Sequence, residues 1–180
     1  MTNETARKPA TTTGKVPSLS PGPRRSIELD RDEALRLLAS VPFGRIVFTR
    51  HALPTVRPVN HVLDGGDIVI RTHDGAALTA RAQEADGAGV VVAYEADVID
   101  PDTHLGWSVV ATGYARLVTD PAELARYQAL LVPWMGHTMD HAVRIGPDLV
   151  TGIRLTADYP LTAGDGGTSG AGHAGDADGV

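Results

Sequence analysis

The chain has 180 residues, a formal net charge of -6 and no cysteine. This length predicts one domain with enough chain to bury a hydrophobic core. The absence of cysteine excludes disulfides, thiolate nucleophiles and cysteine-ligated metal centres. The only lysines are Lys8 and Lys15, so the rest of the chain has neither a Schiff-base lysine nor the lysine of a phosphate-binding P-loop.

The charge is distributed unevenly along the chain. Residues 1–26 hold five basic residues against Glu4 alone, and residues 161–180 hold three acidic residues and no lysine or arginine. The part between them is therefore acidic, which disfavours nucleic acid as a partner. No apolar stretch approaches the roughly 20 residues of a membrane span, and the N-terminus lacks the apolar region of a signal peptide. These observations predict a cytoplasmic protein that binds neither nucleic acid nor a membrane.

Both ends of the chain have the composition of flexible tails. Residues 1–26 are rich in proline and threonine, and residues 161–180 contain seven glycines. Segments with so little apolar surface to bury have nothing to offset the entropy cost of ordering. We therefore predict a disordered N-terminal tail over 1–26, one folded domain over 27–160 and a disordered glycine-rich tail over 161–180.

The predicted domain alternates short strands with short helices. Asp30 followed by Glu33 resembles a capping box at the start of a helix, and Pro121 suits the first turn of another. The pair Gly65-Gly66 between two β-branched runs predicts a tight hairpin turn. In chain order we predict a helix ending near residue 40, strands over 44–49, 54–63 and 68–72, a helix over 75–85, strands over 89–94 and 107–118, a helix over 121–131 and a strand over 149–155.

The order of these elements indicates the fold class. Consecutive strands joined by tight turns favour antiparallel pairing over a doubly wound parallel sheet. Short strands with helices at the corners are typical of a small barrel that closes its own edges. The sequence therefore predicts a mainly β fold with flanking helices.

The familiar catalytic motifs are absent from this domain. Its two serines, Ser40 and Ser108, are outside any Gly-x-Ser-x-Gly elbow, and no Gly-x-Gly-x-x-Gly follows a strand. His137 and His141 are four residues apart, a spacing that on a helix suits metal or haem ligation. The alternative, an irregular loop with both rings in solvent or beside a pocket, is favoured because no third ligand is near. We predict no metal site and name no catalytic residue.

The hairpin around Gly65-Gly66 offers a candidate anion site. A two-residue turn places Arg71 opposite Asn60, and Arg57 on the other face with Thr72. A guanidinium, a hydroxyl and the helix start that follows are the groups that bind anions. The alternative is that Arg71 pairs with Asp67 or Asp74 on the surface.

Several segments, in order, resemble a known family. They are RPVNHVLDGGDIVIRT, GAALTA, YEADVIDPDTHLGWSVVATGYARLV and DLVTGIRL. Together they are similar to the pyridoxamine 5′-phosphate oxidase-like flavin-binding split-barrel family, in the branch that contains nitroimidazole-resistance reductases. The similarity covers residues 28–156. It implies a six-stranded antiparallel split β-barrel and a homodimer with two flavin sites at the subunit interface.

The resemblance also implies which residues bind the cofactor. The strand of Arg57, Pro58, Val59 and Asn60 lines the flavin ring in the family, and the pair Arg71-Thr72 approaches the phosphate. The helix that follows normally begins Gly-x-Lys-Leu, and here Ala77 stands in place of that lysine, before Leu78. Trp107 and Ser108 come to the site from the partner subunit. The loss of the lysine weakens the phosphate site, and Arg81, one helical turn further on, is the candidate replacement.

The function implied by the resemblance is an FMN-dependent oxidoreductase that acts on a small-molecule substrate of unknown identity. The redox chemistry belongs to the flavin, and the protein positions it. Three alternatives stay open. In the first the cofactor is a deazaflavin, in the second the chain is a non-catalytic binding protein that keeps the split-barrel dimer but has lost tight flavin binding at Ala77, and in the third it binds haem through His137 or His141.

Overall fold

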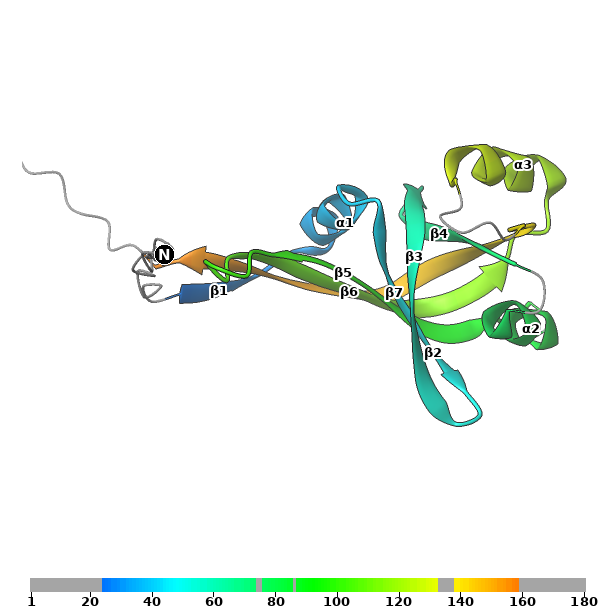
Figure 1. The fold of residues 1–180 in the computed structure, drawn as a ribbon, viewed down its shortest axis with the longest axis horizontal. Helices are drawn as coiled ribbons and strands as arrows, with labels where there is room; N and C mark the ends of the chain where they lie inside the picture. The colour runs from blue at the N-terminus through cyan, green and yellow to red at the C-terminus, as the bar shows by residue number, and fades with distance from the viewer. Residues whose placement is uncertain (1–23, 74–75, 86, 133–137, 159–180) are drawn as a thin grey trace, which may run out of the picture.

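The computed structural model describes residues 24–73, 76–85, 87–132 and 138–158 (Figure 1). None of the helices in these ranges is long and apolar enough to cross a membrane. The described elements are β1 (Arg24–Glu28), α1 (Arg31–Ala39), β2 (Phe43–Arg50), β3 (Leu53–Asp64), β4 (Asp67–Thr72), α2 (Ala77–Glu84), β5 (Val90–Ile99), β6 (Gly106–Leu117), α3 (Pro121–Leu130) and β7 (His141–Ala157).

The strands form one antiparallel sheet that closes on itself. Its order is β1-β7-β4-β3-β2-β5-β6, and β6 also pairs with β7, so six strands complete a ring. Because β7 has 17 residues, its first part pairs with β4 and its last part with β1, while β6 follows its other edge. The predicted six-stranded antiparallel split barrel is confirmed, with β1 as an additional seventh strand.

Strand β1 corrects the predicted domain boundary. The composition predicts that residues 24–26 belong to the N-terminal tail, but Arg24 to Glu28 pair in register with Ala157 to Ile153 of β7. All five side chains of β1 are exposed, so its sequence has no buried face and no apolar alternation to reveal a strand. The strand exists because the free edge of β7 offers it backbone hydrogen bonds.

The central hairpin forms as predicted. Gly65 and Gly66 have φ of +62° and +92°, the left-handed region that a tight turn requires, and His61 pairs with Ile70. Two strands extend well beyond their predicted bounds: β5 continues to Ile99, and β7 begins at His141. In both extensions polar or charged residues interrupt the apolar ones, so a search for apolar runs passes over them. His141 therefore lies at a strand start and not on a helix with His137, which is outside the described residues.

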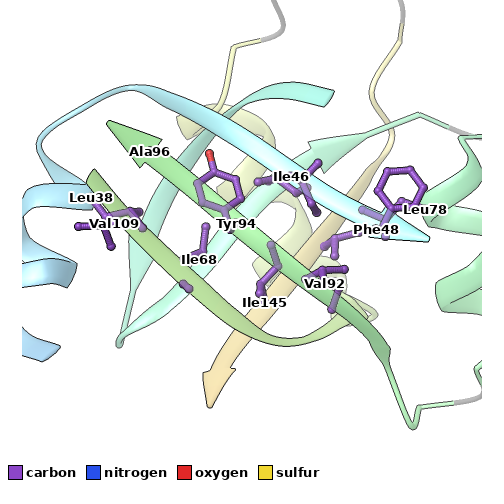
Figure 2. Close-up of a cluster of buried hydrophobic side chains, with 14 of the residues drawn as sticks. Leu38, Ile46, Phe48, Ile68, Leu78, Val92, Tyr94, Ala96, Val109 and Ile145 are labelled. Carbon is purple, nitrogen blue, oxygen red and sulfur yellow. The ribbon is translucent and has the colours of Figure 1, made fainter. Parts of the chain in front are cut away.

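The inward faces of the barrel strands form one hydrophobic core, shown in Figure 2. Helix α1 closes one side of it with Ala34 and Leu38, and α2 closes another with Leu78. Asp30 caps α1 by accepting a hydrogen bond from Glu33 N at 2.8 Å, as the sequence predicted. The buried strand residues include Ile46, Phe48, Ile68, Ile70, Val92, Tyr94, Val109 and Ile145.

A buried polar pair lies within this core. His61 is 5% exposed, and its Nε2 lies 2.9 Å from the carbonyl oxygen of Leu38, so Nε2 carries the proton and donates. The other ring nitrogen, Nδ1, accepts from the Tyr94 hydroxyl at 2.8 Å. Gly44 makes room for the tyrosine ring, because a Cβ at that position would stand 2.7 Å from Cε1 of Tyr94. This pair joins α1, β3 and β5.

We expect the His61–Tyr94 pair to make stability depend on pH. Burial lowers the pKa of His61 below its ordinary value of 6.5. In acid the unfolded chain binds a proton at this residue before the folded chain does, so the free energy of unfolding falls as pH decreases below 6.5. Urea unfolding at a series of pH values measures this slope. His61→Gln should flatten it, and a slope that stays as in the wild type would contradict the prediction.

Candidate functional site

A pocket of about 330 Å³ opens between the β2–β3 hairpin and the start of α2. Apolar side chains from β2, β3, β4 and α2 form most of its wall, and three arginines stand around them. The lining residues are Ile46, Phe48, Arg50, Thr55, Arg57, Pro58, Val59, Ile70, Arg71, Thr72, His73, Ala76, Ala77, Leu78 and Met139. Its size and composition are those of a small-molecule site.

Seven of the ten cofactor-binding residues that the resemblance implied lie in this pocket. The hairpin register brings Arg57 to Val59 of β3 beside the end of β4, and α2 begins directly after it. The barrel therefore gathers side chains that are up to 21 positions apart in the chain. The seven residues are Arg57, Pro58, Val59, Arg71, Thr72, Ala77 and Leu78.

The other three residues lie elsewhere in this subunit. Asn60 donates through Nδ2 to the carbonyl of Val132 at 2.9 Å, so it joins β3 to the segment after α3. Trp107 is 8% exposed and packs in the core. Ser108, the next residue of β6, points to the opposite side of the sheet and lines a shallow groove with Glu28 and Ile153.

The guanidinium of Arg71 donates hydrogen bonds to backbone carbonyls. Nη1 donates to Leu131 O at 2.9 Å and to Gln128 O at 3.3 Å, and Nη2 donates to Met139 O. Nε is buried and has no hydrogen-bond partner among the described residues. Arg71 therefore caps the C-terminal end of α3, where helix carbonyls attract cations. The predicted alternative of a pair with Asp67 is wrong, and Asp74 is outside the described residues.

A polar network holds α3 in place for this contact. The Tyr127 ring is fully buried, and its hydroxyl donates to Asp64 of the hairpin, which also accepts from Arg126. The Tyr127 hydroxyl, and then Arg126, lower the pKa of Asp64. From β7, Arg144 donates to Glu123 at 3.0 Å. Strands β3 and β7 are thus tied to the helix whose end Arg71 caps.

The hydroxyl of Thr72 is also engaged within the protein. Thr79 Oγ1 donates to the carbonyl of His73 at 3.1 Å, so the 3.1 Å contact between the two threonine hydroxyls has Thr72 as its donor. Thr72 and Thr79 are both buried. These bonds fasten the first turn of α2 to the end of β4, which fixes where Ala76 and Ala77 meet the pocket.

Sequence reasoning missed several pocket residues, of which Arg50 is the most informative. Period-two alternation along β2 places Ile46, Phe48 and Arg50 on one face. Only the closure of the barrel turns this face toward α2. Arg81, the expected replacement for the lysine, lines a neighbouring pocket with Thr49 and Glu84 and does not line this one. The other missed lining residues are Ile46, Phe48, Thr55, Ile70, His73, Ala76 and Met139.

The electrostatic character of the pocket is one-sided. Three of its lining residues are arginines, and none of those that the structure describes is aspartate or glutamate. A cleft that concentrates one sign of charge over apolar walls attracts ligands of the opposite sign. His141 is not among the lining residues, and no group of three or more potential metal ligands occurs within the described ranges. The described lining therefore favours an anionic ligand with a large apolar part.

Comparison with known proteins agrees with this class. The family model for pyridoxamine 5′-phosphate oxidase matches residues 30–154. The uncharacterized protein Rv0080 of Mycobacterium tuberculosis is 53% identical over 148 residues, which are 78% of this chain and 97% of that protein. The FAD-binding protein from Mycobacterium smegmatis is 30% identical, with a TM-score of 0.53 over 72% of this chain and 98% of that one. A conserved protein of unknown function from Corynebacterium diphtheriae is also 30% identical, with a TM-score of 0.55 over 73% of this chain and 98% of that one.

The fold and the site together define the class of protein: a split β-barrel with an apolar pocket lined by arginines. Because the family model covers more than two thirds of the chain, this chain belongs to the pyridoxamine 5′-phosphate oxidase family.

Proposed function

We propose that this protein is a flavin-binding oxidoreductase that uses FMN and works as a homodimer. The observation that carries the proposal is the pocket between the β2–β3 hairpin and α2, with apolar walls, three arginines and no carboxylate among its described lining residues. The 30% identical protein from Mycobacterium smegmatis binds FAD, which supports a flavin as the ligand class.

The residues of the pocket fit a phosphorylated flavin. Ile46, Phe48, Val59 and Ile70 offer the apolar surface that a planar ring system needs, and arginine offers charge-assisted hydrogen bonds to phosphate. When bound, the flavin supplies the hydride or electron transfer of the reaction. The protein residues bind and orient the ring and exclude water from one side of it. No side chain of the pocket is assigned a catalytic role.

The proposal of a homodimer rests on the outer face of the sheet. Cross-strand pairing puts Val91 beside Tyr114, and Thr112 beside Leu149, on the side opposite the core. Val91 is 61% and Leu149 59% exposed. An apolar face of this kind marks an interaction surface, and a second copy of the chain is the partner that the family resemblance implies. Ser108 lies on the same face, so dimerisation would bring it to the partner.

A binding titration tests the proposal. FMN fluorescence is expected to be quenched when the purified full-length protein is added, because the ring leaves water for the pocket. A parallel titration with a deazaflavin cofactor separates the two cofactor classes by their affinities. A protein that quenches neither would contradict the proposal, and one that binds FMN without oxidising reduced nicotinamide in the presence of an electron acceptor would be a binding protein and not a reductase.

A further inference from the structure

We propose that Arg50, at the end of β2, binds the phosphate of the flavin. This inference rests on the proposed function, since it assigns the partner of one group of that ligand. It differs from the expectation for the family, in which Arg71 and Thr72 meet the phosphate. Three features of the described structure carry it: the contacts of Arg71 and Thr72, the position of Arg50 and the charges around the pocket.

The first feature is that Arg71 and Thr72 already use most of their donors within the protein, and only Nε of Arg71 is without a hydrogen bond among the described residues. Both terminal nitrogens of Arg71 donate to carbonyls at the end of α3 and at Met139. The hydroxyl proton of Thr72 is given to Thr79. A phosphate that bound the terminal nitrogens of Arg71 would have to displace the backbone carbonyls that accept from them, and the lost hydrogen bonds would cost free energy. These two residues therefore hold α3 and α2 against the end of β4.

The second feature is the position of Arg50 on β2. Phe48 and Leu78 are both buried in one cluster, and Figure 2 shows the phenylalanine ring beside Leu78. Arg50 follows Phe48 by two residues and so points to the same side of β2. Ala77 directly precedes Leu78 on α2, and both Arg50 and Ala77 line the pocket. Arg50 from β2 and Ala77 from α2 thus belong to the wall of one pocket.

The third feature is charge. Within the described residues Arg50 has no ion pair or hydrogen bond, and no carboxylate lines the pocket. Arg57, the other arginine of the hairpin, donates through Nη1 to the carbonyl of Val56 at 2.9 Å. A phosphate monoester carries about -1.5 to -2 charges at neutral pH, and an arginine fork binds it through two parallel hydrogen bonds. Arg50 is the cation of the pocket whose donors are all available for it.

The test compares three flavins on one variant. Fluorescence titrations of riboflavin, FMN and FAD are run on the wild-type protein and on Arg50→Ala. We expect Arg50→Ala to weaken FMN and FAD about tenfold to a hundredfold, the worth of a charge-assisted hydrogen bond, and to leave riboflavin unchanged. The matched control is Arg36→Ala, an exposed arginine in the last turn of α1, which should bind all three as the wild type does.

Further variants separate a ligand role from a structural one. Arg50→Ala should keep the wild-type thermal midpoint, whereas Arg71→Ala should lower it because three carbonyls lose their donor. Adding Ala77→Lys to Arg50→Ala should restore most of the affinity for FMN. Equal affinities of Arg50→Ala and wild type for FMN, or an equal loss for riboflavin and FMN, would overturn the assignment. If the wild type itself bound no flavin, the proposed function would fail first, and the two failures are therefore distinguishable.

Discussion

Trp107→Ala is expected to lower the free energy of unfolding by about 3–5 kcal/mol, the usual cost of removing a buried large aromatic side chain. The indole is 8% exposed and packs in the main core with Ala34, Leu38 and Val109. Such a loss is a large fraction of the stability of a domain of this size. Urea unfolding followed by circular dichroism, at one fixed protein concentration, measures the change.

Two further variants make the Trp107 result interpretable. Trp107→Phe keeps an aromatic ring in the cavity and should cost clearly less than alanine, which keeps the comparison possible if Trp107→Ala does not fold. Ser108→Ala changes the next residue, on the opposite face of the sheet, and should stay within about 0.5 kcal/mol of the wild type. An unfolding midpoint of Trp107→Ala equal to that of the wild type would show that this side chain does not stabilise the core.

Leu149→Arg is expected to convert the proposed homodimer into a monomer. In a twofold-symmetric interface each substitution occurs twice, so two unpaired guanidinium groups would be buried against apolar side chains. The dissociation constant of the dimer should rise about a hundredfold or more. Sedimentation or light scattering reads the result directly, since one chain has a mass of 18.9 kDa. If the flavin lies at the interface, the affinity for FMN should fall together with the dimer.

The control for this experiment has the same chemistry at a different place. Leu130→Arg changes a leucine that is 56% exposed, close to the 59% of Leu149, but Leu130 lies on α3 and not on the outer sheet face. This variant should remain dimeric and bind FMN as the wild type does. The dimer proposal fails if the wild type is monomeric, or if Leu149→Arg and Leu130→Arg behave alike.

Local patterns in the chain predicted most of the elements because each has a local physical cause. The Asp30 cap, the Gly65-Gly66 turn and the apolar runs of β2, β4 and β6 act within a few residues of where they stand. Strand β1 and the extension of β5 lack such a cause. In β5, Glu95 and Asp97 alternate with buried residues and pair with Arg45 of β2 at 3.0 and 2.8 Å. Those carboxylates stand in a strand because a cation faces them across the sheet.

The binding residues also divide into those that a local pattern reveals and those that only long-range contacts reveal. Resemblance to the family selected Arg57, Arg71 and Ala77, and all three line the pocket. Their contacts were not predictable, because the partners of Arg71 are carbonyls 57 to 68 positions away. Arg50 carried no recognisable motif. It belongs to the pocket only because the hairpin folds against α2.

Composition by itself determined which kinds of chemistry are excluded from the domain, through the missing cysteines and the near absence of lysine. They excluded disulfides, thiol chemistry and lysine chemistry in the domain, and the order of the elements indicated the barrel. The tertiary structure alone decided which arginines are free to bind a ligand. Composition counts charges, but whether a guanidinium meets a carbonyl, a carboxylate or a pocket depends on segments brought together when β6 closes the barrel on β7.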